Sequence, residues 1–161
     1  MELEKVRLEA LRKAEKLNLL LQEPGGAVVA FSGGVDSSFL LYKAKQAWGS
    51  ERVLAVTATS ELQPVEEIKE AVETAELLAV KHLVISTEIL SRDEFVENTP
   101  ERCYYCKREL FRCLLQLAEQ HKLPAVLEGS NFDDLDDYRP GLAAAREYGI
   151  RSPLLEAGLT K

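Results

Sequence analysis

The sequence contains a short run of serines and glycines with the composition of an anion-binding loop. The run is Ser32-Gly33-Gly34-Val35-Asp36-Ser37-Ser38. Glycines let the backbone approach an anion closely, and a helix that begins at such a loop directs free N–H groups and a positive dipole toward it. The hydroxyls of Ser32, Ser37 and Ser38 add donors, but no Gly-Lys-Ser/Thr follows, so the lysine grip of kinase-like loops is missing. The run predicts a phosphate site; the alternative is a glycine-rich connector in which Asp36 caps a helix.

A second segment carries two cysteines three positions apart. It reads Arg102-Cys103-Tyr104-Tyr105-Cys106-Lys107, and Thr99-Pro100 before it is typical of a helix start. In the first turn of a helix, the dipole and the neighbouring cations favour the thiolate form of Cys103. Positions three apart share a helix face, so one metal or cluster could take both sulfurs.

Two cysteines alone do not complete a four-ligand zinc site or a typical iron–sulfur site. The alternative is therefore a pair of packed thiols. Cys113 differs, because it lies among leucines at helical spacing, and we expect it in the core.

Apolar runs alternate with helical patterns along the whole chain. We expect helices at 2–22, 39–48, 64–80, 100–120 and 141–148, and strands at 27–31, 53–57, 83–85, 125–127 and 150–154. Strands that alternate with helices predict a parallel sheet with helices on both faces. With 161 residues the chain is expected to form a single α/β domain, 1–161, with about five strands.

Ligands of open α/β sheets bind at the carboxyl ends of the strands. Thr57 and Ala58 end the second predicted strand, and adenine contacts are plausible there; the alternative is an ordinary strand-to-loop exit. An Asp-rich loop, 133–137, follows the fourth strand at the same edge, where one carboxylate could bind Mg²⁺. For any single Asp of that loop, the alternative is a solvated turn.

The overall charge limits the class of partner. The net charge is −7, from 27 acidic and 20 basic residues, and no Lys/Arg block occurs, so nucleic acid is a disfavoured substrate. No apolar run is long enough for a membrane span, and charges interrupt the N-terminal segment, so no signal peptide is expected. A cytoplasmic location follows, where thiols stay reduced.

The Ser-Gly-Gly-x-Asp-Ser motif resembles the PP-loop of the N-type ATP pyrophosphatases, which cut ATP between its first and second phosphates. Further motifs extend this resemblance over nearly all of the chain: Arg-Cys-Tyr-Tyr-Cys-Lys, Gly-Ser-Asn at 129–131, Asp-Tyr-Arg-Pro-Gly at 137–141, and 151–161. Together they resemble the LarE family, ATP-dependent sulfur transferases that help to build the nickel-pincer nucleotide cofactor of lactate racemase. The fold implied is the Rossmann-like adenine nucleotide alpha hydrolase fold.

The resemblance implies a reaction in two stages. ATP adenylates a carboxylate of a pyridinium dicarboxylate mononucleotide and releases pyrophosphate, and a sulfur nucleophile then displaces AMP to leave a thiocarboxylate. Asp36 would help to place Mg²⁺, and Gly129, Ser130 and Asn131 would approach the nucleotide beside the loop. Arg139 and Lys107 are candidates for contacts with a phosphate of the substrate or of AMP; Arg139 could equally brace the acidic loop.

Cys103 and Cys106 match family members in which three cysteines hold a [4Fe–4S] cluster that carries an extra sulfur. The third cysteine and a C-terminal domain lie beyond residue 161 in the family, and Cys113 does not match that position. We therefore expect this chain to correspond to the PP-loop domain of a longer, homo-oligomeric enzyme.

Three other functions compete with this interpretation. A PP-loop tRNA thiolase also combines the loop with Cys-x-x-Cys, but the acidic balance argues against it. An amidotransferase-like or NAD-synthetase-like ligase explains the loop and not the cysteines. A non-catalytic ATP-binding or assembly module would bind ATP without releasing pyrophosphate.

Overall fold

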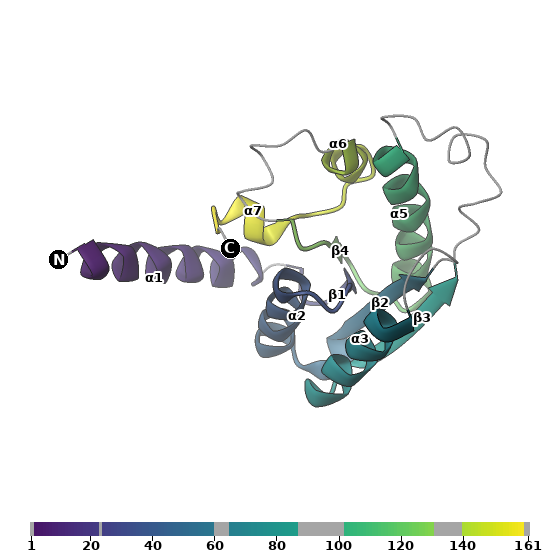
Figure 1. Cartoon of the computed structure of the whole chain (residues 1–161), viewed down its shortest axis with the longest axis horizontal. Helices are drawn as coiled ribbons and strands as arrows, with labels where there is room; N and C mark the ends of the chain where they lie inside the picture. Colours follow the sequence, from purple (N-terminus) through teal and green to yellow (C-terminus); the bar gives the residue numbers. More distant parts are fainter. Residues whose placement is uncertain (1, 23, 60–64, 87–101, 131–139, 160–161) are drawn as a thin grey trace.

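A parallel sheet forms the centre of the protein (Figure 1). The computed structural model describes residues 2–22, 24–59, 65–86, 102–130 and 140–159, with the backbone only at 102–107 and 140–143. The strands are β1 (Ala27–Ala30), β2 (Val53–Thr59), β3 (Lys81–Ser86) and β4 (Val126–Leu127), and their order in the sheet is β3-β2-β1-β4. All neighbouring strands pair in parallel, so their carboxyl ends meet at one edge of the sheet.

Helices cover both faces of this sheet (Figure 1). They are α1 (Glu2–Leu20), α2 (Val35–Trp48), α3 (Val65–Leu77), α5 (Arg102–Gln120), α6 (Pro140–Glu147) and α7 (Pro153–Glu156), with a 3-10 turn η1 (Ser50–Arg52) after α2. One face packs against α2, α3, α7 and the end of α1, and the other against α5 and α6. The predicted α/β architecture, a parallel sheet between two helical layers, is confirmed.

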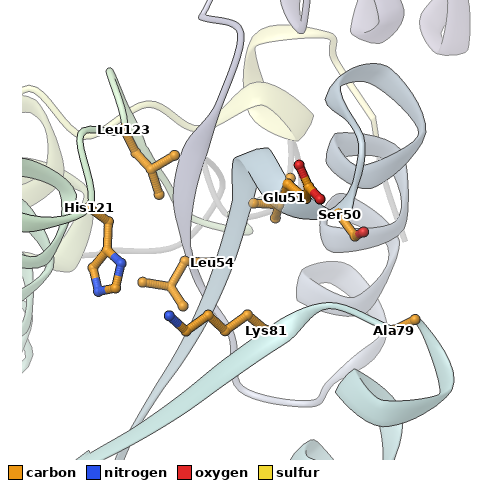
Figure 2. Close-up of a pocket in the computed structure, with 8 residues that line it drawn as sticks. Ser50, Glu51, Leu54, Ala79, Lys81, His121 and Leu123 are labelled. Atoms are coloured by element: carbon orange, nitrogen blue, oxygen red, sulfur yellow. The ribbon is translucent and has the colours of Figure 1, made fainter.

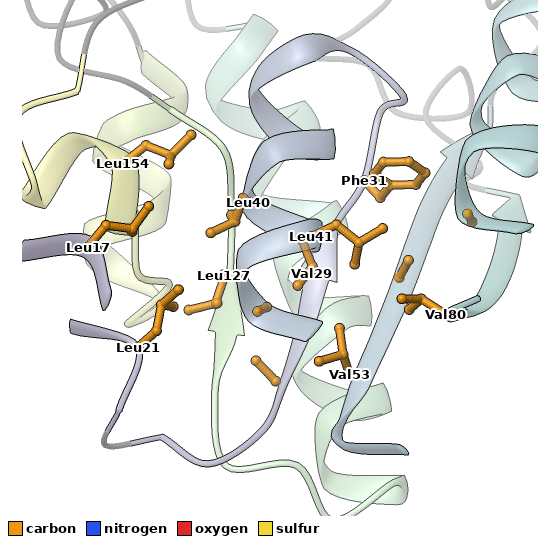
Figure 3. Packing of buried hydrophobic residues seen from close by; sticks show 14 of the residues in the cluster. Leu17, Leu21, Val29, Phe31, Leu40, Leu41, Val53, Val80, Leu127 and Leu154 are labelled. Atoms are coloured by element: carbon orange, nitrogen blue, oxygen red, sulfur yellow. The ribbon is translucent and has the colours of Figure 1, made fainter. Parts of the chain in front are cut away.

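The strand β1 is buried on both faces because its side chains alternate between two apolar cores. Val29 belongs to the core that contains Leu40 and Leu41 of α2 (Figure 3). Val28 belongs to the core on the opposite face, with Phe111 of α5. This double burial fixes β1 as an inner strand, so the loop that follows it emerges near the middle of the sheet edge.

The first helix is helical where we predicted it but packs differently from a core helix. Leu17 and the following Leu21 are buried, whereas Leu3 and Val6 are 86% and 64% exposed. Figure 1 shows most of α1 extending away from the sheet. Among the residues described, no helix is long and apolar enough to cross a membrane.

The predicted fifth strand, 150–154, is wrong. Arg151 makes only an isolated parallel bridge to Leu127, and its N–H donates to the carbonyl of Val126 at 3.0 Å. Pro153 then begins α7, because proline lacks an N–H for a sheet and its fixed φ suits the first helical position. The sheet of the described residues therefore has four strands.

The start of α2 also differs from the prediction. Apolar periodicity predicted a helix from Phe39, but α2 begins at Val35, directly after Gly34 as N-cap. Val35 is 85% exposed, so it contributes no amphipathic signal. As a result, Asp36 and both following serines belong to the first turns of a helix rather than to a loop.

Two adjacent leucines of α5 offer a matched test of the core. Leu114 is fully buried, and Leu115 is 37% exposed. Leu114→Ala should lower the free energy of unfolding by about 2–5 kcal/mol, because it removes buried apolar contacts and leaves a cavity. Leu115→Ala should lower it by less than about 1 kcal/mol. Urea denaturation of both variants measures the difference, and equal losses would contradict the packing of α5 on the sheet.

Candidate nucleotide site

The serine-glycine loop connects β1 to α2 at the carboxyl edge of the sheet. The N–H of Phe31 still donates to the carbonyl of Val56 at 2.9 Å, and the chain leaves the sheet at Ser32. Gly33 has a φ of +85°, in the left-handed region that favours glycine. Gly34 follows in an extended conformation as the N-cap of α2, and no side chain caps it. No protein side chain therefore caps the start of α2, where the first N–H groups of a helix point.

Two serine hydroxyls brace the loop from inside. Ser37 is buried, and its Oγ accepts a hydrogen bond from the N–H of Ser32 at 3.2 Å. The two hydroxyl oxygens of Ser32 and Ser37 lie 3.0 Å apart, and the N–H of Gly34 donates to Ser32 Oγ at 3.3 Å. Ser37 thus acts as an internal support of the loop, while Ser32 is exposed and Ser38 is half-buried.

The loop is seated on α3 through a close backbone contact. A Cβ built on Gly33 would lie 3.1 Å from both Cα and Cβ of Ala71, which is itself fully buried. A side chain at position 33 would require this contact to open by a few tenths of an ångström. The position of the loop is therefore fixed by its contact with α3 as well as by its own hydrogen bonds.

A second glycine joins the end of β4 to the start of α2. A Cβ on Gly129 would lie 3.2 Å from both Cα and N of Ser37. The two segments that we predicted to approach the nucleotide, 32–38 and 129–130, are therefore in contact, whereas Asn131 lies outside the described residues. Asp36, the second residue of α2, is half-buried at the same place, where the helix dipole favours an acidic side chain.

Sequence reasoning missed a buried carboxylate beside this contact. Glu128 is only 6% exposed, and its Oε2 accepts hydrogen bonds from the N–H and the hydroxyl of Ser130 at 3.0 and 2.7 Å. Its Oε1 pairs with the hydroxyl of Ser152, the N-cap residue of α7. The sequence did offer one signal, an acidic residue directly after an apolar strand. A carboxylate that is buried there must find hydrogen-bond donors.

The side chain of Thr57 makes its hydrogen bonds within the sheet and not to the nucleotide edge. It is 2% exposed, its hydroxyl donates to the carbonyl of Phe31 at 2.6 Å, and His82 Nε2 lies 2.7 Å from the same oxygen. Because the hydroxyl hydrogen goes to the carbonyl, the imidazole is the donor to Thr57. A nucleotide contact at this strand end would fall to the main chain and to Ala58, which is half-buried.

The predicted helix around the cysteine pair is present. Since α5 begins at Arg102, Cys103, Cys106 and Lys107 fall in its first two turns. The structure does not describe the side chains of these three residues. It also does not describe Thr99, where we predicted the helix cap, Arg139 or the acidic loop 133–137. Cys113 is half-buried rather than fully in the core. Burial, and secondarily Glu109, raises the pKa of its thiol, while Arg112 lowers it.

The described residues do not complete a metal centre. They contain no group of three or more His, Cys, Asp or Glu side chains that could hold an ion. Cys113 follows Cys106 by seven positions on the same helix, a rise of about 10 Å, which is too far to share one cluster. A cluster on the cysteine pair would need ligands from elsewhere.

A cavity of about 400 Å³ lies at the opposite edge of the sheet (Figure 2). It is lined by the beginnings of β2 and β3 and by the residues after α5: Ser50, Glu51, Val53, Leu54, Ala79, Lys81, His121 and Leu123. The amino ends of the strands are not where the phosphate loop emerges. The cavity is therefore separate from the candidate nucleotide site.

The geometry defines a class of protein: an α/β nucleotide-binding domain with a glycine-serine phosphate loop at the carboxyl edge of a parallel sheet. The sequence profile described as NAD synthase matches residues 13–123, which is most of the chain. The chain therefore belongs to the NAD synthase family, whose members share the PP-loop.

Two curated relatives extend the match beyond the profile. The chain is 39% identical over 149 residues to the pyridinium-3,5-bisthiocarboxylic acid mononucleotide synthase of Lactiplantibacillus plantarum, covering 92% of this chain and 54% of that protein. An uncharacterized protein of Synechocystis sp. is 38% identical over 149 residues, covering 92% of this chain and 55% of the relative. The resemblance to the LarE family is thereby confirmed. The chain spans about half the length of these relatives.

A solved structure supports the fold independently. The U34-tRNA thiolase NcsA from Methanococcus maripaludis, determined with its [4Fe–4S] cluster, has a TM-score of 0.67 and covers 93% of this chain and 59% of its own. The sequence identity is 16%, so this likeness concerns the fold alone. The predicted PP-loop fold is confirmed.

The contact between Gly129 and α2 predicts a specific effect on ATP. Gly129→Ala should push the start of α2 by a few tenths of an ångström and weaken ATP binding about three- to tenfold. Gly149→Ala is the control, because its Cβ meets nothing within 4 Å but its φ of +71° makes alanine strained. This control should lower the melting temperature and leave the ATP affinity unchanged. Calorimetric titration and thermal unfolding separate the two; an equal loss of affinity in both variants would contradict the geometric explanation.

His82 predicts an acid-side loss of stability. Burial lowers the pKa of His82 in the folded protein. Its contribution is therefore full above the unfolded value of about 6.5 and is lost as the pH falls below it, because the unfolded chain takes up the proton more readily. His82→Gln keeps an N–H donor for Thr57, so it should reduce the decline in unfolding free energy between about pH 7 and 5. His121→Gln, the control at the other histidine, should retain the wild-type decline; identical slopes in all three proteins would refute this assignment.

Proposed function

We propose that this chain is the nucleotide-activating part of a LarE-type sulfur transferase. It would adenylate a carboxylate of a pyridinium dicarboxylate mononucleotide, after which sulfur transfer yields a thiocarboxylate. The observation that carries the proposal is the 39% identity, across 92% of the chain, to a synthase of pyridinium-3,5-bisthiocarboxylic acid mononucleotide. The braced phosphate loop supplies the site in which ATP would react.

The first stage needs electrostatic stabilisation more than covalent chemistry. A carboxylate oxygen attacks the α-phosphorus of ATP, and the bond to the pyrophosphate oxygen breaks. Negative charge builds up on the departing pyrophosphate, where the N–H groups at the start of α2 would bind it. Rigid donors do not have to reorganise during the reaction, and the serine bonds of the loop provide this rigidity.

A divalent cation fits this arrangement. Asp36 presents a carboxylate in the first turn of α2, and Mg²⁺ prefers carboxylate and phosphate oxygens. Bound Mg²⁺ would neutralise charge on the phosphates. The remaining nucleotide contacts would come from Ser32, Ser38, Ala58 and the segment 129–131.

The second stage would use side chains near the start of α5. There a sulfur nucleophile attacks the acyl-adenylate carbon, and AMP leaves. Lys107 and Arg139 are our candidates for holding a phosphate of the substrate or of AMP. Cys103 and Cys106 are candidate ligands of a [4Fe–4S] cluster, although the described residues contain no group of three or more His, Cys, Asp or Glu side chains that could hold a metal ion.

We further propose that residues 1–161 act as one PP-loop domain within a homo-oligomer.

A tRNA thiolase is the second candidate function, because the thiolase from Methanococcus maripaludis has the same fold. The net charge of −7 disfavours it, since RNA binding depends on basic side chains that neutralise phosphates.

The experiment is an anaerobic assay of pyrophosphate release from ATP with and without the pyridinium dicarboxylate mononucleotide. Release should require the mononucleotide. Asp36→Ala should lower the rate on the order of a hundredfold, because it removes the carboxylate proposed to hold the Mg²⁺ that neutralises charge on the phosphates. Glu51→Ala, an exposed acidic residue at the opposite edge of the sheet, is the control and should keep the wild-type rate.

Two results would redirect the proposal. Release that needs unmodified tRNA instead of the mononucleotide would identify a thiolase. ATP binding without any pyrophosphate release would identify a non-catalytic nucleotide-binding module.

A further inference from the structure

The hydrogen bonds of Glu128 determine which atoms Ser130 can offer to a ligand. A carboxylate only accepts hydrogen bonds, whereas a hydroxyl has one hydrogen to donate and lone pairs to accept with. The hydroxyl of Ser130 lies 2.7 Å from Glu128 Oε2, so its hydrogen is directed to that oxygen. The N–H of Ser130 is directed to the same oxygen at 3.0 Å. What remains for a ligand at the Ser130 hydroxyl is an acceptor.

The carboxylate itself is held from its other side. Its Oε1 accepts from Ser152, which is buried at 8% exposure and begins α7. The N–H of Glu128 donates to the carbonyl of Arg151 at 2.9 Å. Main chain and side chain of Glu128 are therefore both tied to the segment before α7, so the carboxylate cannot easily turn away from Ser130.

Ser130 lies next to the start of α2, where the loop would hold a nucleotide. It follows Gly129, whose backbone packs against Ser37 of α2, and it is half-buried, so it remains accessible. Phosphate oxygens carry no hydrogen at neutral pH and would face an acceptor at the Ser130 hydroxyl. A ribose hydroxyl or the amino group of adenine does carry a hydrogen to donate.

We propose that Glu128 is a positioning residue that makes Ser130 an acceptor for a hydrogen-bond donor of the nucleoside, a ribose hydroxyl or the adenine amino group. The inference rests on the proposed function, because it requires ATP at this edge of the sheet. It assigns Ser130 to nucleoside recognition and leaves the phosphates to the loop.

The test compares ATP with analogues that each lack one donor. Dissociation constants are measured for ATP, 2′-deoxy-ATP, 3′-deoxy-ATP and the triphosphate of purine riboside, which lacks the amino group. The wild-type chain should bind one of these analogues about five- to tenfold more weakly than ATP, the loss of one hydrogen bond. The analogue that shows this loss identifies the donor.

Ser130→Ala should abolish that difference while pyrophosphate binding stays within about twofold, because the phosphate contacts are elsewhere. Glu128→Ala should reduce it, because the Ser130 hydroxyl keeps its lone pairs but is no longer held in one orientation. Glu128→Gln should preserve it, since the amide oxygen can accept from Ser130 while the amide nitrogen donates to Ser152. A side chain needed only for folding would weaken ATP and every analogue alike.

Controls come from the same residue types away from the site. Ser50→Ala removes a hydroxyl at the opposite edge of the sheet. Glu156→Gln removes the carboxylate of an ion pair with Arg151. Both should keep the wild-type discrimination. A folded Ser130→Ala chain that still discriminates as wild type does would overturn the inference while leaving the proposed function intact. A wild-type chain that binds no ATP would overturn both.

Discussion

The candidate site depends on one steric constraint, the close approach of two backbones where β4 ends and α2 begins. Gly129 lies so near Ser37 that a single methyl group would not fit without displacement. A similar contact between Gly33 and Ala71 seats the loop on α3. The loop is thus clamped between two neighbouring elements, and its N–H groups keep their direction because the main chain around them has no room to move. Backbone donors need this kind of support, since no side chain can compensate when they shift.

The net charge of the chain is unfavourable for binding an anion, whereas the electrostatics at the phosphate loop are favourable. The net charge is −7, yet the proposed ligand is a polyanion. Distance resolves the conflict. At physiological salt, interactions between exposed charges fade beyond about 8–10 Å, so acidic residues on remote surfaces contribute little at the loop. The N–H groups and the dipole of α2 act within hydrogen-bonding distance and dominate there. The acidic surface then mainly selects among partners, because an extended polyanion such as RNA would meet it and a single nucleotide would not.

The sequence was sufficient for the layout and for the place of the glycine-serine loop between a strand and a helix, because both depend on local patterns. Apolar runs buried on two faces are distinctive, and so is a Ser-Gly-Gly-x-Asp-Ser motif between a strand and a helix. It was not sufficient for the start of α2, where Val35 is exposed and leaves no periodic signal. The segment 150–154 looked like a strand by composition, but its pairing reduces to one bridge before Pro153 starts a helix. Glu128 was missed for another reason. Its fixed orientation depends on Ser152, a partner that is distant in sequence and becomes adjacent only in the fold.

The strand order β3-β2-β1-β4 has a consequence for how the protein folds. The pairing of β1 with β2 joins segments that are close in sequence, whereas the pairing of β1 with β4 closes a much longer stretch of chain. Contacts between distant segments carry a larger entropic cost and generally form late. The two parts of the candidate nucleotide site, the glycine-serine loop and the segment 129–130, meet only through this long-range pairing. A partly folded chain could therefore contain the whole glycine-serine loop and still lack the segment 129–130 beside it. Nucleotide affinity would then report on the last stage of folding.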